Sequence, residues 1–203
     1  MSQGMRYVVS GTDTNIGKTV FSAGLAGMLG ARYWKPVQAG LPADSDVVAE
    51  LAGVEVVPEV YRLQLAASPH QAAAEEGITI DPAALNPPAG PVVIEGAGGL
   101  MVPLTPDTLY IDVFARWKLP LILCARTRLG TINHTLLSVE AVRSRDIPLL
   151  GIAFIGEANL ESEKIITEIG KVKRLGRLPV IEPLTAGRLA GVFAKTFERA
   201  DFA

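Results

Sequence analysis

Residues 11–19 read Gly-Thr-Asp-Thr-Asn-Ile-Gly-Lys-Thr and directly follow an apolar run that predicts a strand. A loop between a strand and a helix can surround phosphates with backbone N–H groups, and the helix N-terminus adds partial positive charge. Lys18 would neutralise the β and γ phosphates, and the Thr19 hydroxyl would hold a divalent metal. The stretch therefore predicts a phosphate-binding loop, although Thr12 stands where the common pattern has glycine.

Composition limits the fold and the partners. With 203 residues, of which 49% are hydrophobic, the chain can bury one core, so we predict a single domain over 1–203. We expect no membrane span, since no apolar stretch is long enough, and no nucleic-acid partner, since no run of like charge is present. Cys124 is the only cysteine and the first residues do not resemble a secretion signal, which predicts a cytoplasmic protein. A mean hydropathy of +0.31 favours apolar surface shared between subunits.

Short β-branched runs alternate with segments of helical spacing, which predicts an α/β fold with a mostly parallel sheet flanked by helices. Ser45 and Gly53 are expected to cap the second helix at its start and end. The Pro-rich segment 81–91 is expected to be a connector. The predicted strands span 5–10, 31–34, 92–95, 121–124 and 149–155, with a last one near Leu178, and the predicted helices span 17–29, 46–52, 111–117, 132–145, 162–169 and 185–197.

Polar groups at the carboxyl ends of the strands have priority, because open parallel sheets bind ligands there. Lys35 falls at the end of the second strand, and Glu95 ends the third before the glycine-rich residues 96–99. Mg²⁺ prefers a few oxygen ligands and keeps several waters, so Thr19, Asp46 and Glu95 form a candidate set. For Asp46 alone, favourable placement in the first turn of a helix is the alternative interpretation.

The segment 129–134 begins a long predicted helix with a glycine and a hydroxyl, which suits a bound carboxylate or phosphate. A simple helix cap is the alternative and, for this segment taken alone, the favoured one. We interpret His134 as structural, and neither His70 nor His134 lies in a metal-binding spacing.

Together these segments resemble the dethiobiotin synthetase family, whose members have the P-loop NTPase fold. The resemblance is carried by the leading Gly-Thr-Asp-Thr of the phosphate-binding loop at 11–19, and by further matches in the same order along the chain. These are Lys-Pro-Val at 35–37, Ser-Pro-His at 68–70, Glu-Gly-Ala-Gly-Gly at 95–99 and Leu-Gly-Thr-Ile-Asn-His at 129–134.

The resemblance implies a reaction of CO₂ with 7,8-diaminononanoate, driven by ATP in the presence of Mg²⁺. One amine forms a carbamate, whose oxygen attacks the γ-phosphate to give a carbamic–phosphoric anhydride, and the second amine then closes the ring and expels phosphate. Such phosphoryl transfer depends on positioning and positive charge, so Lys18 and Lys35 are the predicted catalytic residues. The family resemblance also implies a homodimer, in which the segment 129–133 holds the substrate carboxylate of the partner subunit.

Two sets of site residues follow from the resemblance. The expected nucleotide contacts are Thr14, Asn15, Ile16, Gly17, Lys18, Thr19, Val20, Asp46, Glu95, Gly96, Ala97, Gly98, Leu178, Pro179, Val180 and Glu182. The expected substrate contacts are Lys35, Ala39, Leu129, Gly130, Thr131 and Asn133.

The chain departs from the family pattern at several positions. Ala39 stands where a serine or threonine is common, so a hydroxyl contact to the substrate is absent unless Gln38 replaces it. Near Gly156 an asparagine that contacts the base is missing, which leaves base contacts to backbone near 178–180 and to Glu182. Asn15 stands where an acidic residue is frequent.

Other nucleotide-binding proteins of this fold class are the alternatives. Partition and septum-site ATPases carry a signature lysine that would fall at Asp13, and its absence argues against them. An amide ligase of the cobyrinate type is normally longer because it is fused to a glutaminase. A generic nucleotide-binding module is the remaining alternative.

Overall fold

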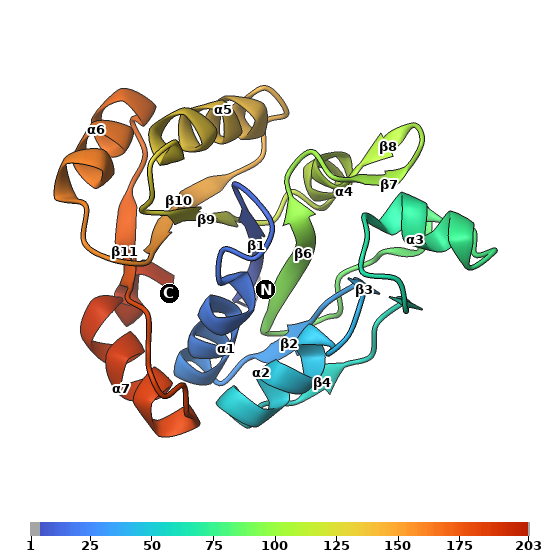
Figure 1. Cartoon of the computed structure of the whole chain (residues 1–203), viewed down its shortest axis with the longest axis horizontal. Helices are drawn as coiled ribbons and strands as arrows, with labels where there is room; N and C mark the ends of the chain where they lie inside the picture. The colour runs from blue at the N-terminus through green and yellow to red at the C-terminus, as the bar shows by residue number, and fades with distance from the viewer. Residues whose placement is uncertain (1–4, 203) are drawn as a thin grey trace.

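The structure is a computed structural model that describes residues 5–202 (Figure 1). Its centre is a seven-stranded sheet in the order β11-β10-β9-β1-β6-β2-β4, in which every neighbouring pair is parallel. The strands are β1 (Arg6–Gly11), β2 (Arg32–Trp34), β3 (Val37–Ala39), β4 (Val56–Val57), β5 (Tyr61–Leu63), β6 (Val92–Gly99), β7 (Pro103–Thr105), β8 (Thr108–Leu109), β9 (Leu121–Arg126), β10 (Leu149–Ile155) and β11 (Arg174–Leu178). The helices are α1 (Lys18–Leu29), α2 (Asp44–Ala52), α3 (Pro69–Glu75), α4 (Tyr110–Trp117), α5 (Thr131–Arg143), α6 (Leu160–Gly170) and α7 (Ala186–Thr196), with short 3₁₀ turns at Pro82–Ala84 and Arg199–Phe202.

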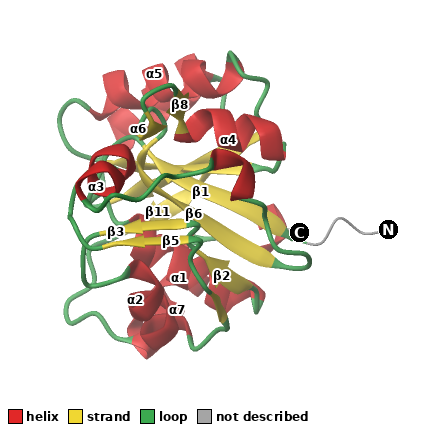
Figure 2. Ribbon diagram, turned by 90° about the vertical axis from the view of Figure 1, so that its right-hand side faces the viewer, coloured by secondary structure: helices red, strands yellow, loops and turns green. Residues whose placement is uncertain are grey.

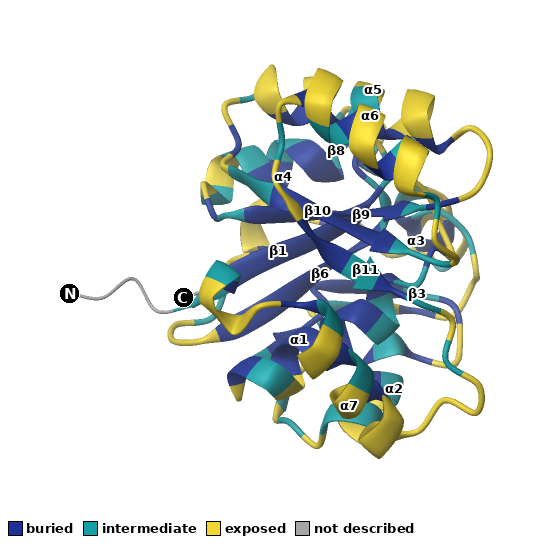
Figure 3. Cartoon of the chain, turned by 90° about the vertical axis from the view of Figure 1, so that its left-hand side faces the viewer, coloured by how far each residue is buried: buried dark blue, intermediate teal, exposed yellow. Residues whose placement is uncertain are grey.

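Helices cover both faces of the sheet. Figure 2 shows α1, α2 and α7 on one side and α4, α5 and α6 on the other. Successive side chains of a strand point to opposite faces, and β1 follows this rule: Tyr7 and Val9 belong to the core under α1, whereas Val8 belongs to the core under α4 and α5. Both faces of the central strands are therefore buried, as Figure 3 shows, which explains their continuous apolar sequences.

The predicted α/β architecture with a parallel sheet is confirmed. The strand predicted at 149–155 is matched by β10, and the other main strands and helices agree to within a few residues. The largest difference is at β6, which continues through the glycines to Gly99, where a turn was expected after Glu95. The strand continues because Gly99 still pairs with Gly11, after an irregularity that shifts the register of β1 against β6.

Ser45 does not cap α2, contrary to the prediction. The helix begins at Asp44 after Ala43, and the Ser45 hydroxyl instead donates a hydrogen bond to Glu59 at 2.5 Å. The predicted stop at Gly53 is confirmed, since this glycine is left-handed with φ of 62°. Among the described residues the prediction also missed the pair β3–β5, the hairpin β7–β8, the edge strand β4 and the helix α3.

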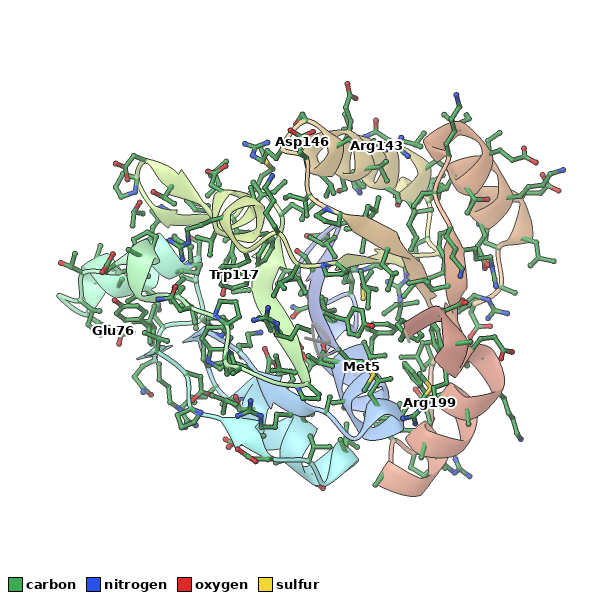
Figure 4. The ribbon with its side chains drawn as sticks, turned by 180° about the vertical axis from the view of Figure 1, so that it is seen from behind. Met5, Glu76, Trp117, Arg143, Asp146 and Arg199 are labelled. Atoms are coloured by element: carbon green, nitrogen blue, oxygen red, sulfur yellow. The ribbon has the colours of Figure 1, made fainter. Side chains whose placement is uncertain are left out.

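The connector 81–91 contains a short 3₁₀ turn and is fastened to α4. Trp117, labelled in Figure 4, donates from Nε1 to the Leu85 carbonyl at 2.8 Å, and Arg116 donates to the same oxygen at 2.7 Å. These bonds hold the chain that leads into β6. Within residues 5–202, no helix combines the length and the apolar character needed to cross a bilayer.

Candidate functional site

The phosphate-binding loop lies between β1 and α1 at the carboxyl end of the sheet. Gly17 precedes the helix with φ of 96°, a left-handed conformation that favours glycine. Asn15 is also left-handed, with φ of 53°, which asparagine tolerates better than most residues. The loop tip at residues 13–15 is exposed, whereas Ile16 is buried and anchors the loop to the core.

Two cationic side chains donate hydrogen bonds to carbonyl groups of the phosphate-binding loop, one from the start of α1 and one from the end of β9. Lys18 Nζ donates to the Asp13 carbonyl at 3.0 Å, so the ammonium lies inside the curve of the loop. Arg126, at the end of β9, donates from Nη2 to the Thr14 carbonyl at 2.6 Å. Arg126 was not among the predicted site residues, although its place at the end of a central strand is a signal for such a role.

Beside the loop, a buried carboxylate collects three hydrogen bonds. Glu95 Oε1 accepts from Thr19 Oγ1 at 3.0 Å and from Lys35 Nζ at 3.2 Å, and Oε2 accepts from the Tyr33 hydroxyl at 3.0 Å. The Lys35 ammonium also pairs with Asp44. Glu95 and Tyr33 are completely inaccessible to solvent, and Lys35 is 4% exposed. The parallel strands β2 and β6 thus bring the predicted Lys35 and Glu95 together at the start of α1.

The buried charges alter proton affinities in opposite directions. Burial lowers the pKa of Lys18 below its usual value. Burial also disfavours the charged form of Lys35, but the Glu95 and Asp44 carboxylates outweigh it and raise the pKa of Lys35. Burial, together with the Glu95 carboxylate, raises the pKa of Tyr33 well above its usual value, so this hydroxyl is a donor. Lys35 is therefore a permanent cation in the site.

These groups face a cavity of about 620 Å³. Most of the predicted triphosphate contacts line it, as do both predicted catalytic lysines. The predicted residues in its wall are Thr14, Asn15, Ile16, Gly17, Lys18, Thr19, Lys35, Ala39, Glu95, Ala97 and Gly98. The wall also contains residues that were not predicted as contacts: Gln38, Gly40, Leu41, Pro42, Asp44, Val47, Ala66, Ala67, Ser68, Pro69 and Val102.

Three predicted contacts near the cavity do not line it. Asp46 is turned outward, with a side chain 68% exposed and 3.2 Å from Arg62, whereas Asp44 of the same helical turn faces Lys35. Val20 lies beyond the cavity wall. Gly96 packs against the Phe114 ring, which a Cβ atom at this position would approach to 2.7 Å.

The remaining predicted residues lie elsewhere. Leu129, Gly130 and Asn133 are exposed at the start of α5, while the Thr131 hydroxyl is buried within hydrogen-bond range of Thr135, at 3.4 Å. None of the segment 129–133 lines the cavity of its own chain.

The predicted base-binding residues beyond β11 border a second hollow of about 410 Å³. Pro179, Val180 and Glu182 line it, together with residues of α7, but Leu178 does not. Near the expected position of the missing asparagine, Gly156 has φ of 121°, and a Cβ atom there would lie 2.7 Å from Thr127 Oγ1. A side chain at this position is therefore disfavoured by both the backbone and its neighbour.

The Gln38 amide, which lines the cavity beside Ala39, is engaged by the backbone. Its Nε2 donates to the carbonyls of Ala39 and Gly40, at 3.3 and 2.9 Å, and its Oε1 accepts from the Asp44 N–H at 3.1 Å. The buried amide thereby caps the first turn of α2 and sets Asp44 beside Lys35. No local sequence signal marks this contact, because a glutamine before the helix is not a usual N-cap residue.

The donor set suits a hard cation that also binds phosphate. In the described part of the chain, no three His, Cys, Asp or Glu side chains cluster closely enough to hold a metal ion by themselves. Mg²⁺ at nucleotide sites uses one or two carboxylates, with phosphate oxygens and waters completing its shell. The Thr19 hydroxyl and the Glu95 carboxylate, 3.0 Å apart at the start of α1, fit this requirement.

Known proteins resemble the chain along its length. A family model described as an AAA domain matches residues 5–188. The ATP-dependent dethiobiotin synthetase of Rhodopseudomonas palustris is 62% identical, over 97% of this chain and 96% of that protein. The protein of the same name from Sphingopyxis alaskensis is 57% identical, over 97% of this chain and 98% of that protein. The chain belongs to the dethiobiotin synthetase family.

Solved structures outside the dethiobiotin synthetase family share the fold. A plasmid partition protein from Borrelia burgdorferi superimposes with a TM-score of 0.58 at 10% identity, covering 96% of this chain and 99% of that one. A ParA family ATPase from Chlorobium tepidum gives 0.54, also at 10% identity, covering 93% and 98%. At 10% identity these two structures show a shared fold and nothing more. The relatives at 57–62% identity confirm the predicted resemblance to the dethiobiotin synthetase family.

Proposed function

We propose that the chain is an ATP-dependent dethiobiotin synthetase, which joins CO₂ to 7,8-diaminononanoate and closes the ureido ring. The observation that carries this proposal is the shared cavity, where the buried Lys35 ammonium lies beside the phosphate-binding loop. A dethiobiotin synthetase needs this arrangement, because its carbamate must meet the γ-phosphate. The full-length similarity to proteins of that name supports the same conclusion.

The reaction needs positive charge more than covalent help from the protein. One substrate amine attacks CO₂ and loses a proton to give a carbamate. A carbamate oxygen then attacks the γ-phosphorus, ADP leaves, and the second amine attacks the carbamoyl carbon and expels phosphate. We assign Lys18 to the phosphates and Lys35 to the carbamate and the transferring phosphoryl group, where preorganised charge stabilises the transition state.

We assign the Mg²⁺ site to Thr19 and Glu95, with a further carboxylate from the first turn of α2. When bound, the ion neutralises charge on the β- and γ-phosphates. Asp46 is the sequence-based candidate for the further carboxylate, whereas Asp44 is the acid that faces the cavity. Comparing Asp44→Asn with Asp46→Asn identifies the ligand, because only the ligand's variant should raise the Mg²⁺ concentration needed for half-maximal rate.

A homodimer would complete the substrate site. The start of α5 is exposed and apolar, with Leu129 fully accessible and Ile132 38% exposed, and it does not reach the cavity of its own chain. We propose that this segment, with Gly130, Thr131 and Asn133, holds the substrate carboxylate of the partner subunit. A helix N-terminus favours such an anion by about 0.3–1 kcal/mol, with hydrogen bonds in addition.

We assign base recognition to the loop after β11, where Pro179, Val180 and Glu182 border the second hollow. This loop offers mainly backbone groups in place of the missing amide near Gly156. We place the activity in the cytoplasm, whose reducing conditions suit a chain with one free, buried cysteine, Cys124.

The test is turnover by the purified protein with 7,8-diaminononanoate, bicarbonate, Mg²⁺ and either ATP or CTP. Dethiobiotin detected by mass spectrometry, in step with phosphate release, supports the proposal, and the ratio of the two nucleotides reports the base preference. Slow hydrolysis that ignores the diamine and yields no ring product contradicts it and favours a nucleotide-switched ATPase.

A further inference from the structure

Tyr33 provides the one hydrogen bond of Glu95 that the proposed reaction does not use. The two side chains come from neighbouring parallel strands, β2 and β6, in which Tyr33 is in register with Val93. Residues two apart on a strand point to the same face, so Tyr33 and Lys35 both face the side on which Val93 and Glu95 lie. Strand β2, with the residue that directly follows it, thus supplies two donors to one carboxylate.

The three donors to Glu95 are shared between its two oxygens. Lys35 and Thr19 occupy Oε1, at 3.2 and 3.0 Å, on the side of the phosphate-binding loop. The Tyr33 hydroxyl occupies Oε2 at 3.0 Å, in a position with no access to solvent. A carboxylate held at one oxygen has a fixed rotation, so its other oxygen keeps a constant direction toward the cavity.

We propose that Tyr33 is a positioning residue for the metal site: its hydroxyl fixes Glu95 so that Oε1 faces the divalent cation of the bound nucleotide. This inference rests on the proposed function, since it assumes that Glu95 holds that cation. Hydrogen-bond partners of metal-ligating carboxylates commonly alter metal affinity when they are removed. Here the partner is a buried tyrosine with a carboxylate acceptor.

A purely structural role for Tyr33 would require only that its buried hydroxyl find some hydrogen-bond acceptor. A buried tyrosine needs some acceptor, and Tyr7 satisfies that need far from the site by donating to the Phe202 carbonyl at 2.7 Å. Both tyrosines are buried, but only the Tyr33 hydroxyl reaches a candidate metal ligand. Tyr7→Phe is therefore the matched control for the loss of one buried hydroxyl.

The experiment measures binding of a non-hydrolysable ATP analogue as Mg²⁺ is titrated, with and without a chelator. For Tyr33→Phe, the Mg²⁺ concentration for half-maximal binding should rise by about 10- to 100-fold. Its affinity for the analogue in the chelator should stay at the wild-type value, since the phosphate-binding loop is unchanged. Mn²⁺ electron paramagnetic resonance on the same complexes should show weaker ion binding in Tyr33→Phe and unchanged binding in Tyr7→Phe.

Two results would overturn the inference. In the first, Tyr33→Phe keeps the wild-type Mg²⁺ dependence and differs only in melting temperature, as Tyr7→Phe should. In the second, analogue binding by the wild type itself is indifferent to Mg²⁺, which removes the assumed metal site as well. Dethiobiotin formation by the wild type is measured separately, so failure of the proposed function is distinguishable from failure of the role of Tyr33.

Discussion

Replacing Lys35 by methionine removes the charge while keeping an unbranched apolar side chain, and it should damage both stability and catalysis. At the observed 3.2 Å from Glu95 and an effective dielectric constant of about 20, Coulomb's law gives an attraction of about 5 kcal/mol. Desolvation of the ammonium offsets part of this attraction, but removing one partner of a buried pair still costs about 3–5 kcal/mol of unfolding free energy. The lost positive charge should also remove about 3–4 kcal/mol of transition-state stabilisation, or about 10²–10³-fold in kcat/KM.

Chemical denaturation and dethiobiotin turnover measure the two effects separately. Lys35→Met leaves Glu95 and Asp44 without their cation, and Glu95 is the one of the two that is fully buried. Adding Glu95→Gln removes that buried charge, so the double variant should regain stability relative to Lys35→Met without regaining activity. The single variant Lys35→Arg should keep the positive charge but not wild-type turnover, because a planar guanidinium does not reproduce a buried point charge. A Lys35→Met protein with a wild-type unfolding midpoint and near-normal turnover would refute the role of this ion pair.

Three further outcomes are expected. Arg126→Gln should weaken nucleotide binding by up to about tenfold in calorimetry through loss of its bond to Thr14, and an unchanged affinity would show that the loop holds its shape without it. Because burial lowers the pKa of Lys18, the free enzyme loses this positive charge at a lower pH than an ordinary lysine would, so nucleotide affinity should fall on the alkaline side. Binding there should take up a proton, measurable by calorimetry in buffers of different ionisation enthalpy, and buffer-independent heats would contradict the assignment. Burial raises the pKa of the Cys124 thiol, so thiol reagents should modify it only when the protein unfolds; rapid modification of the native state would be inconsistent with the structure.

The sequence predicted the fold well wherever an element packs on the central sheet. The continuous apolar run of β10 is typical of a central strand in an α/β chain, and its bounds were predicted correctly. The pair β3–β5 was missed because strands three residues long carry almost no periodic pattern. Their pairing depends on tertiary contacts, which local propensity does not describe.

The site residues likewise divide into those that the sequence pattern predicted and those that depend on tertiary contacts. Lys18 was predicted from the phosphate-binding loop motif, and Lys35 and Glu95 because each stands at the predicted carboxyl end of a strand, where open parallel sheets bind ligands. Asp44 lines the cavity but was not among the predicted residues, whereas the predicted Asp46 of the same helical turn points outward. The side chain of α2 that faces inward depends on where the helix starts, and the start is set by the distant amide of Gln38. Such a side-chain cap acts across six residues and has no recognisable motif.

The most direct test of the proposed chemistry follows one oxygen atom. If the carbamate oxygen attacks the γ-phosphorus in the cavity that contains Lys18 and Lys35, that oxygen leaves with the phosphate when the ring closes. Turnover with ¹⁸O-labelled CO₂, measured faster than the label exchanges with water, should therefore release phosphate that carries one ¹⁸O atom for each dethiobiotin formed. Unlabelled phosphate, released whether or not 7,8-diaminononanoate is present, would contradict the synthetase mechanism.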